Sequence, residues 1–158
     1  MKENKFRGKT TEGKWLYGSL INNAFFVERT NVPVCYIFDN EYDDYGSWED
    51  IAEILDECEV LNETVGQYIG VNDNTGKEIY KGDIVELPRC NNTRAIVEEF
   101  GVGYILRETD GSGFIRFSDE PNPFNFKVIG NIYENPELLE LVYWQLFTRY
   151  DIIIIEVK

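Results

Sequence analysis

The chain of 158 residues contains no histidine, one methionine and three cysteines. Without histidine, the ordinary Ser–His and Cys–His nucleophile pairs cannot form, and the zinc sites that use histidine cannot form either. Cys35, Cys58 and Cys90 are widely spaced and form no CxxC pair, so we expect reduced thiols and no bound metal or cofactor. These absences argue against catalysis, and we expect a protein that is not an enzyme.

Long apolar runs are also missing. No stretch approaches the roughly 20 apolar residues that a membrane-spanning helix requires. The first seven residues, Met-Lys-Glu-Asn-Lys-Phe-Arg, lead into polar residues and not into the apolar centre of a secretion signal. No glycine run has the spacing of a P-loop or a dinucleotide-binding turn. We therefore expect a cytoplasmic protein with no membrane partner.

Basic residues are absent from one segment. Residues 39–63 carry eleven acids and no lysine or arginine, within a chain of net charge −14. Aromatic side chains lie among these carboxylates, so this acidic block is a candidate surface for a basic protein partner. The alternative is a solvated face, which is the common role of a charge run. The candidate partner-binding residues are Asp39, Glu41, Tyr42, Asp43, Asp44, Tyr45, Trp48 and Glu49.

Aromatic residues are abundant, at 15% of the chain, and short alternating segments recur between turn residues. This pattern predicts a mostly β fold of the small barrel or sandwich type. We expect strands at residues 15–21, 34–38, 84–87, 95–100, 104–106, 114–117 and 124–133. Asn22 and Asn23 are expected to turn the chain after the first of these strands.

Two short helices are expected beside the strands. Residues 47–57 begin at Ser47, a favourable cap, and carry apolar residues at helical spacing. Residues 135–147 begin with Asn135 as a cap and Pro136 at the first helical position.

Four glycines punctuate residues 63–87, which lead into an alternating strand. Residues 71–75 resemble a calcium loop in composition, but their spacing is short, so a turn is favoured. Lys81, Gly82 and Asp83 could contact a ligand, although a turn that aims the next strand is the favoured interpretation. The residues assigned to structural turns are Gly66, Gly70, Gly76, Gly82 and Asp83.

Several segments together resemble the YopX protein family of phages and prophages. They are residues 63–87, residues 6–9, residues 15–20, and the segment Val-Ile-Gly-Asn-Ile-Tyr-Glu-Asn-Pro at 128–136. The resemblance implies a mostly β fold with an SH3-like barrel element and no particular activity. It suggests one YopX-like domain over residues 1–140, with the acidic insert at 39–63 and the barrel core at 63–134. Residues 141–158 form an apolar extension.

The apolar extension contains more hydrophobic groups than a solvated terminus should expose. We expect them to pack on the protein's own core or on another copy, including by strand addition of residues 151–156 to a sheet edge. The residues assigned to tail packing or oligomer contacts are Tyr143, Trp144, Phe147, Tyr150, Ile152 and Ile154.

The functional hypothesis is a phage-encoded accessory protein that binds another protein or itself. One alternative is a nucleic-acid-binding factor that uses the basic start of the chain, where Lys5, Arg7, Lys9 and Lys14 alternate with Phe6 and Trp15. The net charge of −14 disfavours direct nucleic-acid contact, because phosphate attraction dominates such binding.

A metal-dependent hydrolase is the last alternative. It would use a carboxylate pair such as Asp43 with Asp44 or Glu98 with Glu99. Neighbouring acids in an acidic chain are far more often a solvated face.

Overall fold

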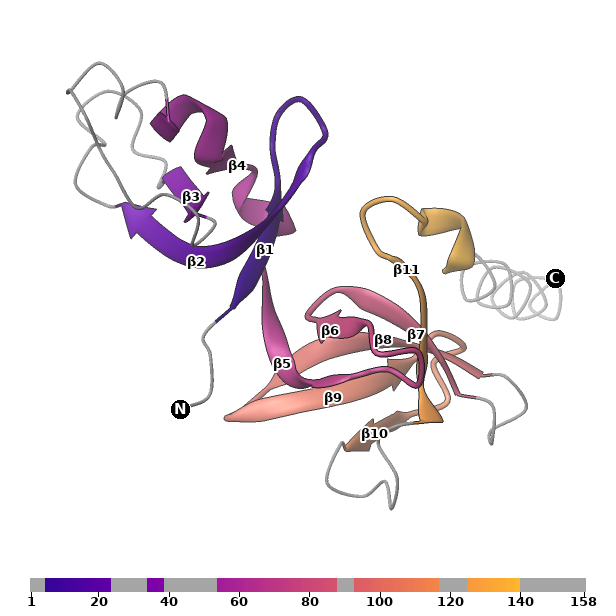
Figure 1. Cartoon of the computed structure of the whole chain (residues 1–158). Coiled ribbons are helices and arrows are strands. Elements are labelled where there is room, and N and C mark those ends of the chain that lie inside the picture. The colour runs from indigo at the N-terminus through magenta and orange to yellow at the C-terminus, as the bar shows by residue number, and fades with distance from the viewer. Residues whose placement is uncertain (1–4, 24–33, 39–53, 88–92, 117–124, 140–158) are drawn as a thin grey trace, which may run out of the picture. The chain divides into compact units, whose positions relative to one another are not determined.

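The computed structural model describes residues 5–23, 34–38, 54–87, 93–116 and 125–139 (Figure 1). Antiparallel strands dominate these ranges, so the predicted mostly β fold is confirmed. The strands are β1 (Phe6–Lys9), β2 (Trp15–Asn23), β3 (Val34–Phe38), β4 (Glu59–Val60), β5 (Gly66–Asn72), β6 (Glu78–Tyr80), β7 (Asp83–Leu87), β8 (Thr93–Phe100), β9 (Gly103–Glu108), β10 (Phe114–Arg116) and β11 (Lys127–Asn131). Two 3₁₀ helices accompany them, η1 (Asn62–Thr64) and η4 (Pro136–Leu138).

The strands form two sheets. A six-stranded sheet has the order β4-β3-β2-β1-β5-β6, and a five-stranded sheet has the order β10-β9-β8-β7-β11. The chain divides into two compact units, residues 1–70 and 71–158, which are described separately below.

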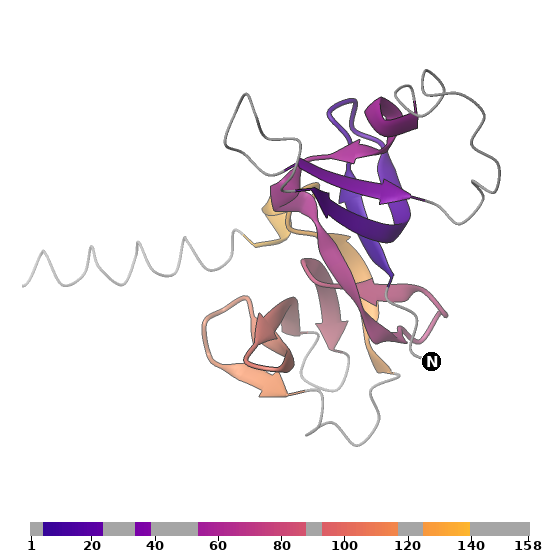
Figure 2. The ribbon, with the colours of Figure 1, turned by 90° about the vertical axis from the view of Figure 1, so that its left-hand side faces the viewer.

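The first unit has a small core beneath β1, β2 and β3, which run side by side in indigo and purple in Figure 2. Ile37 and Val60 are buried at its centre, and Phe6 and Leu16 pack against them. β1 lies so close to these residues that a Cβ on Gly8 would come within 2.8 Å of the Val60 Cγ2. Gly8 is therefore needed for packing, not for a turn.

The second unit has the larger core. Its strands alternate, so that Val85, Ala95, Val97 and Leu106 are fully buried on paired positions of β7, β8 and β9. Each buried aliphatic side chain of valine or leucine size contributes about 1.5–3 kcal/mol through the hydrophobic effect. The stability of this unit thus comes from a core that the alternating sequence pattern specifies.

Two sequence-based predictions fail in detail. Asn22 and Asn23 do not turn the chain, because β2 continues through both and Asn23 pairs with Val34 of β3. Asn135 does not cap a helix through its side chain: η4 follows it with Pro136 at its start, but no cap hydrogen bond is made.

Other predicted elements lie partly outside the described ranges. Of the helix predicted at 47–57, the described part is helical, as residues 54–58 show. Of the helix predicted at 135–147, the described part is η4. Within the described ranges, no helix has the length and apolar character that crossing a bilayer demands.

Candidate functional site

The described residues of the second unit form a groove of about 690 Å³, which is within the range of roughly 300–1,000 Å³ that ligand sites occupy. It is open, and polar and apolar groups both line it. We call it the Gly82 groove. Its walls come from the β6–β7 turn, β8, the turn after β8, and the segment that follows β11. The lining residues are Lys81, Gly82, Ile96, Val97, Glu98, Glu99, Gly101, Ile132, Tyr133 and Leu139.

Gly82 joins three walls of the groove. Its N–H donates to the Val97 carbonyl (2.9 Å), and its carbonyl accepts from the Ile132 N–H (3.0 Å). Its φ of +85° is in the left-handed region that favours glycine. A Cβ at this position would also lie 3.2 Å from Cε2 of Tyr133. Two independent features, the backbone angle and the tight approach to the Tyr133 ring, therefore favour glycine here.

Asn131 fixes the segment that carries Tyr133. Its Oδ1 accepts from the N–H groups of Tyr133 and Glu134, both at 3.0 Å. Its own N–H donates to the Asn135 Oδ1 (3.2 Å). Gly130 makes this possible, because any Cβ there would overlap the Asn135 side chain. The Gly-Asn-Ile-Tyr-Glu-Asn run is thus a self-bonded turn that holds Tyr133 in the groove wall.

We expect Asn135→Ala to lower the free energy of unfolding by about 1 kcal/mol, because one part-buried hydrogen bond to the Asn131 N–H is lost. Urea denaturation measures this change. Asn135 Nδ2 also contacts Glu137, so Glu137→Ala is the control that isolates the exposed contact. An equal loss in both variants would contradict the role given to Oδ1.

Two ion pairs lie at the rim of the groove. Lys81 Nζ is 3.4 Å from Glu99 Oε2, and Arg107 Nε is 2.6 Å from Glu98 Oε2. Burial, and then the charge of Glu99, raises the pKa of Tyr104 above its ordinary value. Glu98 and Glu99, considered above as a carboxylate pair, face different cations. The rim offers both signs of charge beside apolar walls.

The described ranges contain few residues that could bind a metal ion or act as reactive thiols. Those ranges contain no group of three or more potential ligands that could hold a metal ion. Asp73 resembles a calcium ligand in the sequence, but its carboxylate accepts hydrogen bonds from Thr75, Lys77 and Val128. Cys35 and Cys58 are buried free thiols in the first unit, and burial raises the pKa of each.

The basic start of the chain is partly turned inward. The Arg7 guanidinium lies 4.9 Å from the Trp15 ring centroid, and Lys9 Nζ lies 5.9 Å from the same centroid. Arg7 is 4% exposed, so its charge packs on the indole and is not presented to solvent. Arg7 is therefore not an accessible cation for phosphate contact, whereas Lys14 is exposed.

The predicted sites fall in different parts of the chain. The acidic-block candidates from Asp39 to Glu49 and the tail candidates from Tyr143 to Ile154 lie outside the described residues. Gly70, Gly76 and Gly82 have positive φ, Gly66 and Gly70 lie within β5, and Asp83 begins β7. Asp83 Oδ2 accepts from the Tyr80 N–H (2.8 Å) across the turn.

The Gly82 groove was missed by reasoning from the sequence. From the sequence, a turn is the favoured interpretation of Lys81, Gly82 and Asp83, with ligand contact as the alternative, and the segment around Tyr133 is noted only for its resemblance to a family. The available signal is that two glycine-bearing motifs, whose Gly82 and Gly130 are 48 residues apart, both belong to that resemblance. Nothing in the sequence showed that they would meet.

The fold and the groove define a mostly β protein of two antiparallel sheets with an open groove on the second unit. The chain belongs to the YopX protein family, whose model matches residues 5–140, and it is a phage-like protein of that family. A search among curated proteins gave no match. Among solved structures, the chain is similar to protein EF1440 from Enterococcus faecalis, with 19% identity, a TM-score of 0.49, and coverage of 86% of this chain and 97% of the other.

Proposed function

We propose that this YopX-family protein is a cytoplasmic accessory protein, not an enzyme, that binds a protein partner through the Gly82 groove. The observation that carries the proposal is the construction of the groove. The two family motifs meet in it, since Gly82 is hydrogen-bonded to Ile132 and packs against Tyr133. Residues that fold the second unit therefore also shape this groove.

The chemistry of the groove fits a segment of protein chain. Ile132, Tyr133 and Leu139 provide apolar surface for one or two side chains of a partner. Lys81 and Glu99 at the rim provide a donor and an acceptor for the partner's backbone or polar groups. Apolar walls with a few convergent polar groups are typical of binding sites.

We expect Leu139→Asp to weaken partner binding at least about tenfold, because a carboxylate would be placed among apolar groups that the partner desolvates. The half-buried position of Leu139 makes a folded variant attainable. Tagged wild-type and variant proteins are compared by quantitative capture from host lysate, and then with the purified candidate. Glu137→Lys, at an exposed position of η4, is the matched control. Equal binding by wild type and Leu139→Asp would overturn the assignment of the groove.

The acidic block remains a predicted second contact for a basic partner. Neutralising Asp43, Asp44 and Glu49 together should reduce capture of basic host proteins and leave the melting temperature unchanged. Salt-sensitive retention of the wild-type chain on DNA would instead support the nucleic-acid alternative.

A further inference from the structure

The two edges of the five-stranded sheet differ. At β11, the turn at residues 73–77 covers the edge, because Val128 N–H donates to Asp73 Oδ2 (3.0 Å) and Asn74 N–H donates to the Phe126 carbonyl (2.9 Å). At the other end, β10 pairs with β9 on one side, and no strand among the described residues pairs with its outer side. An uncovered edge is a template for another strand.

The backbone of β10 faces that open edge. Opposite residues in an antiparallel pair alternate between those that exchange hydrogen bonds and those whose N–H and C=O point away from each other. The Glu108 N–H donates to the Gly113 carbonyl (3.0 Å), and Phe114 stands opposite Arg107 one position further on. Phe114 and Arg116 therefore occupy non-hydrogen-bonded positions, and their N–H and C=O groups point outward.

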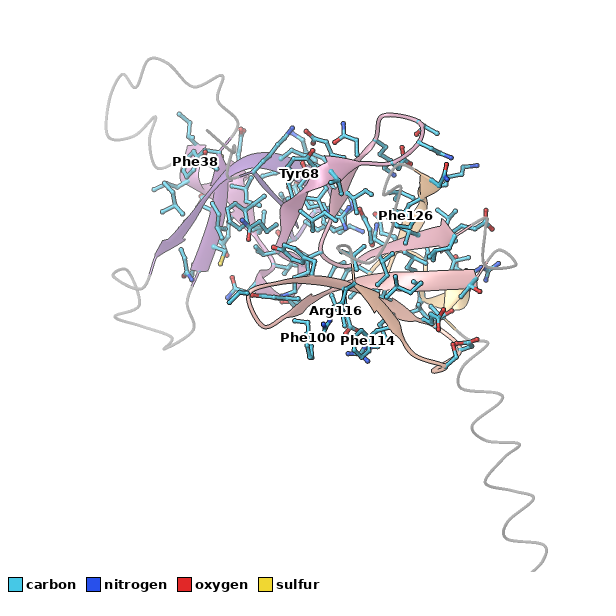
Figure 3. All side chains as sticks on the ribbon, turned by 90° about the horizontal axis from the view of Figure 1, so that it is seen from below. Phe38, Tyr68, Phe100, Phe114, Arg116 and Phe126 are labelled. Carbon is cyan, nitrogen blue, oxygen red and sulfur yellow. The ribbon has the colours of Figure 1, made fainter. Side chains whose placement is uncertain are left out.

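The side chains beside this edge are an aromatic pair and a cation. Phe100 and Phe114 are 51% and 46% exposed, with ring centroids 5.7 Å apart. Arg116 is exposed and makes no hydrogen bond or ion pair with any residue in the described part of the chain. Figure 3 shows the three side chains gathered on one side of the sheet. A strand added to β10 would meet an apolar surface and a positive charge two residues apart.

We propose that residues 151–156 of a second copy of this chain add to the β10 edge as a strand. The segment reads Asp-Ile-Ile-Ile-Ile-Glu, and its β-branched residues favour an extended conformation. Ile154 and Glu156 are two residues apart, so in a strand that runs parallel to β10 they share a face and stand beside Phe114 and Arg116 at the same spacing of about 6.8 Å. An isoleucine would cover the phenylalanine pair while a glutamate meets Arg116.

Charge supports this occupant. Each copy carries a net charge of −14, so two copies repel each other, and a local attraction between opposite charges favours their association. Arg116 of one copy and Glu156 of the other supply that attraction. The inference concerns β10 and not the Gly82 groove, so it can fail while the proposed function stands.

The test is a charge exchange in the full chain, read as mass in solution by light scattering across a concentration series. Arg116→Glu and Glu156→Arg should each weaken self-association at least about tenfold, because like charges then face each other across the strands. The double variant should restore the wild-type mass. Lys127→Glu, an exposed charge reversal on β11 at the covered edge, is the matched control and should leave the mass unchanged.

Several results would overturn the proposal. They are a monomeric wild-type chain at all concentrations, single variants that associate like the wild type, or a double variant that does not recover. A single variant whose melting temperature falls while its mass stays constant would indicate that residues 151–156 pack within their own chain. That result also contradicts docking between copies. Arg116 is exposed, so the variants should fold, and circular dichroism checks this.

Discussion

Replacing Asp73 with alanine is expected to lower the free energy of unfolding by about 3 kcal/mol. The side chain is 5% exposed, and its carboxylate accepts from Thr75 N–H (2.7 Å), Thr75 Oγ1 (2.6 Å), Lys77 N–H (2.9 Å) and Val128 N–H (3.0 Å). Alanine would leave the buried Val128 N–H without this acceptor and would release the turn from the edge of β11. Chemical denaturation of both proteins measures the difference.

Asp110 provides the matched control for this experiment. Its carboxylate also accepts from a backbone N–H and a hydroxyl two residues on, both from Ser112. Asp110 is exposed, so water replaces these bonds, and we expect Asp110→Ala to change stability by no more than about 0.5 kcal/mol. Comparable losses in the two variants would show that local turn bonds, and not the link to Val128, stabilise the unit.

The contribution of Asp73 should also depend on pH. Burial raises its pKa, but the hydrogen bonds from Thr75, Val128 and Lys77 outweigh burial and hold the pKa below its usual value. A lowered pKa in the folded state means that the stabilisation is complete above the unfolded value of about 3.9 and is lost as pH falls through the folded value. The stability difference between wild type and Asp73→Ala should therefore be constant near neutral pH and shrink below about pH 4. A difference that grows on acidification would contradict this assignment.

Replacing Gly82 with alanine is expected to destabilise the second unit by about 2–3 kcal/mol, from two separate causes. The φ of +85° is unfavourable for any residue with a Cβ. The new methyl group would also press on the Tyr133 ring at 3.2 Å, which should shift Tyr133 and alter the Gly82 groove. Denaturation gives the stability change, and near-ultraviolet circular dichroism reports changes in the packing of the aromatic side chains, Tyr133 among them.

Gly76 separates the two causes. Its φ of +89° is nearly the same, but a Cβ there would meet nothing within 4 Å. Gly76→Ala should therefore show the backbone effect alone, about 1–2 kcal/mol. If the two variants lose equal stability, the contact with Tyr133 contributes nothing, and the groove wall is less tightly packed than the structure indicates.

Much of the fold follows from local pattern. The sequence predicts four of the strands, β3, β7, β8 and β9, because apolar residues alternate or cluster between turn residues. Burial of the apolar positions stabilises strands with that pattern. The turn predicted at Asn22 and Asn23 is wrong, because the turn preference of asparagine is weak and the pairing of β2 with β3 overrides it. The predicted helix cap at Asn135 fails because the Asn135 side chain accepts a hydrogen bond from the Asn131 N–H instead. That hydrogen bond depends on the space beside Gly130, which has no Cβ.

By itself, the sequence determined the fold class, the family and the exclusion of histidine chemistry, since periodicity, motif order and composition are properties of the chain alone. The tertiary structure decided which segments meet: Gly82 with Tyr133 in one groove, Asp73 with Val128 at one sheet edge, and Phe100 with Phe114 beside the other. These contacts depend on the register and order of strands distant in sequence. Hydrogen bonding and burial fix that register only when the whole sheet forms.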